Sequence, residues 1–166
     1  INLKNSEKFF EIAHKNKCRI ICFPEAFLTK DSVSEYDENF ARSAKKTFSE
    51  MCRKYFIYGI MGSIIERIGK IFFNLSYLFD DCGKIIGNYK KIHLVKYNEG
   101  KNMKRGKSAD VFKTRFGKIG IQICRDLLYP EVTREMMLKG VEIVFCPSYW
   151  CSRSSSYEKE SRIRNY

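Results

Sequence analysis

Short apolar runs alternate with amphipathic helical segments along this chain, and this alternation constrains its fold more than any other feature. Residues 6–17 carry apolar side chains on one side of a helical pattern, and the run 18–23, ended by Pro24, then predicts a buried strand. Residues 40–55 repeat apolar side chains at intervals of three and four, which predicts a second helix. Strands that alternate with helices in this way indicate the α/β class.

The rest of the chain adds hairpins and one more helix to this pattern. Three β-rich segments are separated by glycine-bearing turns, and we expect them to pair as consecutive hairpin strands. A polar, aperiodic loop follows, of a length that is often functional. Another hairpin, a helix between Pro130 and Gly140, and a last buried strand complete the expected order. The β-rich segments are 56–65, 71–79 and 84–89, the loop is 91–109, the second hairpin pairs 110–113 with 118–123, and the last strand is 141–146.

The composition excludes several classes of protein. With 166 residues, 44% of them hydrophobic, we expect a single domain over residues 1–166 with its own core. The formal charge is +12, but the basic residues are dispersed along the sequence, so we expect no nucleic-acid partner. The longest apolar stretches run about six residues, whereas a membrane helix needs roughly 20, so we expect a soluble protein.

The seven cysteines occur at irregular spacings, most of them within apolar runs. This usage is typical of a reducing compartment, and we expect a cytoplasmic protein. Because there is no Cys-x-x-Cys pair, and only His14 and His93 could complete a ligand set, we expect neither a metal site nor another cofactor.

Three residues that can do chemistry share one context. Glu25, Lys91 and Cys124 each lie where a predicted strand gives way to a loop. The carboxyl ends of strands in α/β sheets converge on the ligand crevice, so these distant residues can meet there. An ammonium lowers the pKa of a nearby thiol and a carboxylate accepts its proton, so the set favours nucleophilic attack by Cys124 on an amide carbonyl. Lys91 and the backbone N–H after Cys124 could stabilise the oxyanion, and Glu25 could protonate the leaving amine.

Each of these residues also has a plainer interpretation. Taken alone, Cys124 could be a small packing residue, Glu25 a surface carboxylate or helix cap, and Lys91 a solvated side chain. His93 offers a competing Cys–His dyad, but with Leu94 beside it we favour a packed, hydrogen-bonded histidine.

The three positions lie in motifs that resemble those of the nitrilase superfamily, the carbon–nitrogen hydrolases. The resemblance implies that Glu25 is the general base, Lys91 the oxyanion stabiliser and Cys124 the nucleophile. The matching segments are 21–29 for the Glu motif, 89–94 for the Lys motif, and 120–126 with 129–131 for the Cys motif.

The resemblance further implies a four-layer α-β-β-α sandwich that forms a homodimer or larger assembly and hydrolyses small linear amides through a thioester. The ω-amidases and N-carbamoyl hydrolases are such enzymes, and nitrile hydrolysis is a minority activity of the superfamily. Because domains of this family begin earlier and continue further, we expect the chain to be incomplete at both ends. A catalytically silent scaffold and a basic nucleic-acid-binding module are the two alternative functions.

Three more residues resemble substrate-contacting positions of the family. Glu99, eight residues beyond Lys91, matches a second glutamate near the substrate, with a solvated loop carboxylate as the alternative. Tyr149 and Trp150 match a pocket-lining segment, with core packing as the alternative.

Overall fold

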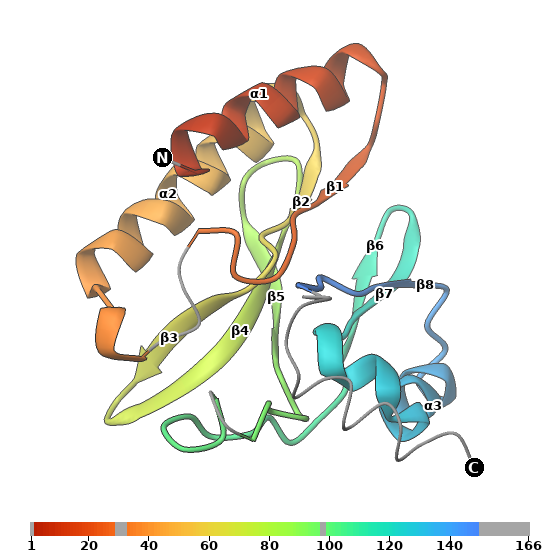
Figure 1. Ribbon diagram of the computed structural model, residues 1–166. Helices are drawn as coiled ribbons and strands as arrows, with labels where there is room; N and C mark the ends of the chain where they lie inside the picture. The colour runs from red at the N-terminus through yellow and green to blue at the C-terminus, as the bar shows by residue number, and fades with distance from the viewer. Residues whose placement is uncertain (1, 29–32, 97–98, 150–166) are drawn as a thin grey trace.

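The computed structural model describes residues 2–28, 33–96 and 99–149 (Figure 1). The helices expected at 6–17, 40–55 and after Pro130 are confirmed, as is the second hairpin. The helices are α1 (Asn2–Lys15), α2 (Glu38–Tyr55) and α3 (Pro130–Leu138), with two short 3-10 helices, η1 (Val33–Glu35) and η2 (Cys124–Leu128). The strands are β1 (Ile20–Cys22), β2 (Tyr58–Ile60), β3 (Ile64–Ile68), β4 (Ile71–Phe79), β5 (Ile85–Lys90), β6 (Val111–Thr114), β7 (Gly117–Ile121) and β8 (Ile143–Phe145).

The strands form two sheets. In the first, β1 pairs with β2 in parallel, and β4 pairs antiparallel with each of β2, β3 and β5. In the second, β6 and β7 form an antiparallel hairpin, and β8 joins β7 in parallel after the crossover through α3. Because two antiparallel steps restore the direction, β1, β2 and β5 all run the same way.

The prediction of one strand at 56–65 is wrong, because the chain there forms β2 and then β3 on different parts of β4. The break contains Gly62, whose φ is +67°. A Cβ atom at Gly62 would lie 2.1 Å from the carbonyl oxygen of Pro24, so only glycine fits this close approach. The interruption of the strand therefore makes room for the backbone that carries Glu25.

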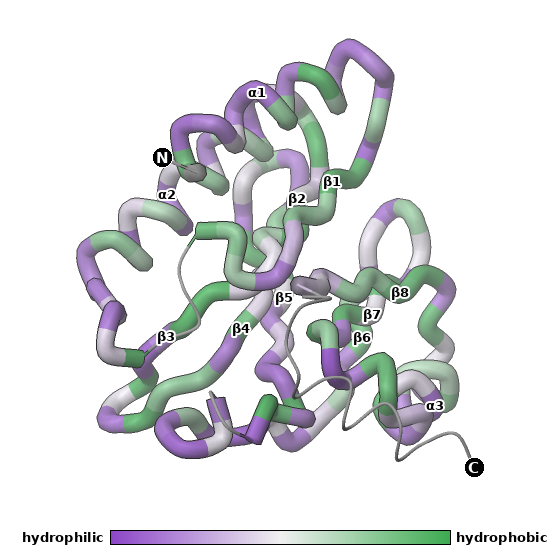
Figure 2. Tube along the Cα trace, in the orientation of Figure 1, coloured by the Kyte–Doolittle hydropathy of each residue, from purple (hydrophilic) through white to green (hydrophobic). Residues whose placement is uncertain are grey.

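Two buried clusters define the order of the layers. One joins α1 and α2 to the first sheet through Phe10, Phe48 and Phe79, all fully buried. The other joins the first sheet to the second sheet and α3, with Leu78 on one side and Ile121 on the other. The order α1 and α2, first sheet, second sheet, α3 confirms the expected four-layer sandwich (Figure 1). Figure 2 shows hydrophilic and hydrophobic residues alternating along α1 and α2, as expected for helices that cover one face of a sheet.

The strands predicted at 18–23 and 141–146 are confirmed in place, but their predicted full burial is wrong. The side chains of β1 and β8 are exposed or half-buried. Each strand stands at the end of its sheet, with a paired neighbour on one side only among the described residues. Within the same residues, no helix is long and apolar enough to cross a membrane.

Candidate active site

Four strands deliver the candidate residues from their carboxyl ends. Glu25 follows β1, Lys91 follows β5, Cys124 follows β7 and Tyr149 follows β8. The two sheets come into contact at this end of the molecule. The backbone N–H of Tyr149, after β8, donates a hydrogen bond to Oε2 of Glu25, after β1, at 3.2 Å. The structure therefore brings together residues that are far apart in the sequence, as the strand-end pattern predicted.

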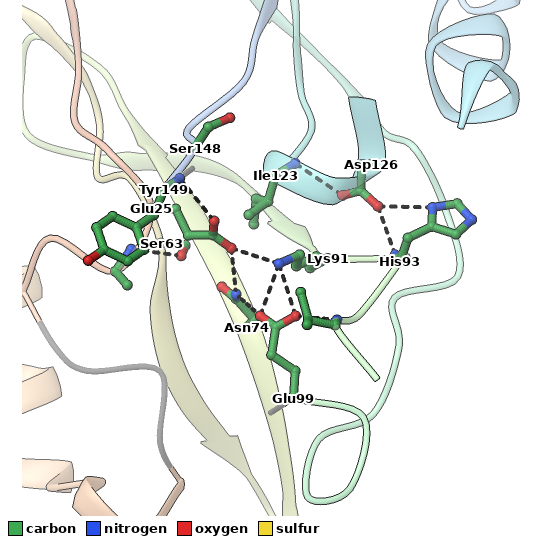
Figure 3. Close-up of polar contacts among 12 residues, drawn as sticks. Glu25, Ser63, Asn74, Lys91, His93, Glu99, Ile123, Asp126, Ser148 and Tyr149 are labelled. Carbon is green, nitrogen blue, oxygen red and sulfur yellow. Dashed lines mark hydrogen bonds and ion pairs between the residues drawn. The ribbon is translucent and has the colours of Figure 1, made fainter. Parts of the chain in front are cut away.

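Lys91 lies between two buried carboxylates (Figure 3). Its Nζ is 2.7 Å from Oε1 of Glu25 and 2.9 Å from Oε2 of Glu99. The side-chain amide of Asn74 lies between the same two carboxylates, and Nδ2 donates to Oε1 of Glu25 at 3.3 Å and to Oε1 of Glu99 at 2.5 Å. All four side chains are almost completely buried.

The charge of Lys91 is held by these two carboxylates. Burial alone lowers the pKa of an ammonium, but the negative charges and hydrogen bonds of Glu99 and Glu25 outweigh this effect and raise the pKa of Lys91 above its usual value. Lys91 is therefore a permanent cation in a site that excludes most water. Such a group is suited to stabilise negative charge that develops during a reaction.

Cys124 sits in the turn between β7 and α3, where η2 begins. Its φ is +46°, a left-handed conformation that few residues other than glycine adopt, and its side chain is only 1% exposed. The backbone N–H of Cys124 donates to the carbonyl of Pro147 at 2.9 Å, which ties this turn to the chain after β8. Strain of this kind is often found at functional sites.

The pKa of the Cys124 thiol is raised to about 12, mainly by burial and then by the neighbouring Glu25 carboxylate, which acts both as a charge and as a hydrogen-bond partner. Lys91 acts in the opposite direction, as the sequence suggested, but its effect is smaller. The thiol is therefore protonated at neutral pH. A base must take its proton before the sulfur can attack, and Glu25 is in place to do so.

Glu99 and Tyr149 are placed differently from the plain alternatives. Glu99 is 2% exposed and also accepts a hydrogen bond from the backbone N–H of Val95 at 2.7 Å. The alternative interpretation of Glu99 as a solvated loop carboxylate is therefore wrong. Tyr149 is 61% exposed, which rules out core packing, and it reaches the site through its backbone. Trp150 lies outside the described residues.

Asp126 links the Lys and Cys motifs. Its buried carboxylate accepts hydrogen bonds from the hydroxyl of Tyr89 at 2.8 Å, the backbone N–H of His93 at 2.7 Å and the backbone N–H of Ile123 at 3.0 Å. Nδ1 of His93 is 3.0 Å from the same carboxylate, and its ring stacks on Tyr129 at a centroid distance of 3.5 Å. These contacts agree with a packed, hydrogen-bonded His93.

Sequence reasoning missed Asn74 and Asp126. The signal for Asn74 was a polar amide in the middle of the apolar run of β4, and the signal for Asp126 was its place two residues after Cys124. Among the described residues, no group of three His, Cys, Asp or Glu side chains is arranged to hold a metal ion.

Comparison with known proteins places the chain in a family. The sequence model of the carbon–nitrogen hydrolases matches residues 1–163. A probable nitrilase of Schizosaccharomyces pombe is 30% identical over 158 residues, and the match covers 89% of this chain and 57% of that protein. An omega-amidase of Danio rerio is 26% identical over 157 residues, which cover 88% of this chain and 57% of that protein. The chain thus spans less than two thirds of these relatives.

Solved structures share the fold. A carbon–nitrogen hydrolase from Helicobacter pylori G27 superposes with a TM-score of 0.81 at 26% identity, covering 98% of this chain and 60% of that one. An amidase from Nesterenkonia superposes with a TM-score of 0.84 at 16% identity, covering 94% of this chain and 63% of that one. The sequence match over nearly all residues and the shared fold lead to the same conclusion: the chain belongs to the carbon–nitrogen hydrolase family.

Proposed function

We propose that this chain carries the catalytic site of an amidase that hydrolyses small linear amides through a thioester on Cys124. The observation that carries the proposal is the position of Lys91 between the buried carboxylates of Glu25 and Glu99, beside a buried thiol whose proton Glu25 can accept. A buried thiol, a base and a fixed cation are the groups that acyl transfer to water requires.

In the first half of the proposed reaction, Sγ of Cys124 attacks the amide carbon while Glu25 accepts the thiol proton. The carbonyl oxygen becomes an oxyanion, which Lys91 Nζ and the backbone N–H after Cys124 stabilise. The carbon–nitrogen bond then breaks, and the leaving nitrogen takes the proton from Glu25. The products of this half are ammonia or an amine and a thioester on Cys124.

In the second half, water hydrolyses the thioester. The oxygen of the water molecule attacks the thioester carbon while Glu25 accepts a proton from that water. The second oxyanion is stabilised by the same two donors as the first. The carbon–sulfur bond breaks, the acid product leaves, and the sulfur recovers its proton from Glu25. Glu99 and Asn74 act through Lys91 and Glu25 in this scheme, since they hold both groups in place.

The proposed substrates are amides of the ω-amidase or N-carbamoyl type. Support comes from relatives named omega-amidase in Danio rerio and Saccharomyces cerevisiae, which are 26% and 27% identical to this chain. A silent scaffold does not account for a charged residue held between two buried carboxylates, because burying such a set is costly unless it has a use. The buried ionic groups therefore favour an enzyme over a silent scaffold or a basic nucleic-acid-binding module.

Ammonia release from a panel of linear amides and carbamoyl compounds tests the proposal. Activity requires Cys124, so Cys124→Ala should abolish release, whereas Cys82→Ala, at an exposed free cysteine, should leave it unchanged. Equal release by the Cys124→Ala variant would contradict the proposal. Binding of nucleic acid with no amide turnover would favour the basic module instead.

A cytoplasmic homodimer or larger assembly is the remaining part of the proposal. The six described cysteines are all free, which suits a reducing compartment. Met137 and Leu138 on α3 are 66% and 77% exposed, and Glu131 and Arg134 on the same helix could pair with each other across two copies. Light scattering should give at least twice the monomer mass, and Met137→Glu should reduce it to the monomer mass.

A further inference from the structure

A hollow of about 270 Å³ next to β4 and β5 is lined by four basic side chains that the proposed hydrolysis does not use. Lys90 comes from β5, and Lys104, Arg105 and Lys107 come from the loop before β6. Asp110 is the one carboxylate among the lining residues that the structure describes. The hollow, called the basic pocket here, therefore has more positive than negative charge.

The basic pocket is built by the backbone. The N–H of Lys104 donates to the carbonyl of Phe72 at 2.8 Å, and the N–H of Gly106 donates to the carbonyl of Lys91 at 2.9 Å. A Cβ atom at Gly106 would lie 2.0 Å from the carbonyl oxygen of Lys90, so glycine is needed for this contact. These contacts press the loop onto the end of β5 and bring its three cations beside Lys90.

The four cations have no carboxylate partner among the described residues. Asp110 instead accepts from the hydroxyl of Ser108 at 2.9 Å and lies 3.8 Å from the ammonium of Lys139. The ammonium of Lys90 lies over the ring of Phe73, 4.8 Å from its centroid. Like charges that gather in one concave place repel one another, and a bound anion relieves this repulsion.

The basic residues are dispersed along the sequence, but the fold brings four of them together in the basic pocket. Lys90 and Lys91 are neighbours in an extended segment, so their side chains point to opposite sides of the sheet. Lys91 faces the carboxylates of the candidate active site, and Lys90 faces the basic pocket. The two sites therefore lie on opposite sides of the end of β5 and do not compete for a ligand. In Figure 1, the loop after Gly100 runs along the lower ends of β4 and β5.

We propose that the basic pocket binds a small anion that carries phosphate groups. The hollow has room for one or two phosphate groups beside the four cations. The guanidinium of Arg105 can bind two phosphate oxygens at once, and the lysines add point charges around them. Ile71 and Phe73 give the pocket an apolar side, and Asn88 adds an amide.

Isothermal titration of the full chain with pyrophosphate tests this proposal at low and at moderate salt. We expect saturable binding of one pyrophosphate that weakens as salt increases. The double variant Arg105→Gln with Lys107→Gln should bind about tenfold more weakly or worse, since hydrogen bonds to charged groups are the strong ones. Both side chains are exposed, so the variant should unfold at the same temperature as the parent.

The matched control removes two exposed lysines outside the pocket, Lys8→Gln with Lys46→Gln, and should leave the affinity unchanged. An equal loss in this control would show binding to the net charge alone and would overturn the proposal. Unchanged binding by the pocket variant would overturn it as well. Citrate, which has a similar charge but no phosphate, should bind more weakly, and equal binding would contradict the phosphate assignment. None of these outcomes depends on amide hydrolysis.

Discussion

Nζ of Lys91 lies 2.7 Å from Oε1 of Glu25, and neither side chain is more than 4% exposed. Glu99 completes the cluster from the other side of the ammonium at 2.9 Å. The cluster joins the cation proposed to stabilise the oxyanion to the base proposed to activate the thiol. Removal of the cation should therefore affect both stability and catalysis.

Lys91→Met should lower the rate of amide hydrolysis by about a hundredfold or more, because one oxyanion donor is lost. It should also lower the free energy of unfolding by about 3–5 kcal/mol, because two buried carboxylates lose their counter-charge. Urea denaturation and ammonia release measure the two effects.

The matched control is Lys54→Met, which breaks the exposed pair between Lys54 and Glu7 at 2.6 Å. Because both side chains of this pair are in contact with water, its loss should barely change the free energy of unfolding, with activity kept. Equal activity of the Lys91 variant and the parent would contradict the assigned role of Lys91.

The pH dependence of Cys124 alkylation follows from its raised pKa. Only the thiolate reacts, so the rate of carbamidomethylation by iodoacetamide should keep increasing with pH beyond 9 and level off only near 12. Glu25→Gln removes a negative charge that opposes the thiolate, so the profile should move to lower pH. Burial is the larger cause and is unchanged, so the profile should stay above pH 9.

Mass spectrometry of the Cys124 peptide measures this profile, with the peptide of exposed Cys82 as the internal control. The Cys82 profile should be the same in both proteins. A Cys124 profile that is unchanged in the Glu25→Gln variant would mean that Glu25 does not face the thiol.

Asp126→Asn should weaken the link between the Lys and Cys motifs. The three donors on Asp126 need carboxylate oxygens, and an amide offers one oxygen and a competing NH₂ group. Because the side chain is fully buried, the free energy of unfolding should fall by about 1–3 kcal/mol. The turn at Cys124 would shift, so kcat should fall more than KM rises.

Glu50→Gln, an exposed change on α2, is the control for this variant and should alter neither the stability nor the kinetics. Steady-state kinetics and urea denaturation distinguish the two variants. A stability loss with an unchanged kcat would mean that Asp126 supports the fold without positioning Cys124.

Local patterns predicted much of this structure. The helical spacing of 40–55 identified α2, and Asp37, just before it, caps the helix by accepting from the backbone N–H groups of Asn39 and Phe40. The predicted strand ends placed Glu25, Lys91 and Cys124 in the right context, because the carboxyl ends of parallel strands share one edge. These features depend on residues close together in the sequence.

Features that depend on distant partners could not be predicted in this way. Asn74 bonds to Glu25 and Glu99, which are 49 and 25 residues away, so its role is not visible in the run that contains it. The break at Gly62 is set by the backbone of Pro24. The raised pKa of the Cys124 thiol results from burial in the assembled fold, which outweighs the effect of Lys91.

The most direct test of the central claim is intact-mass spectrometry of the unaltered protein, quenched with acid while it turns over a linear amide substrate. The quenched protein should gain the mass of the acyl group, and the peptide with Cys124 should carry it. If the acyl group were found on another residue, or if the Cys124→Ala variant gained the same mass, Cys124 would not be the nucleophile.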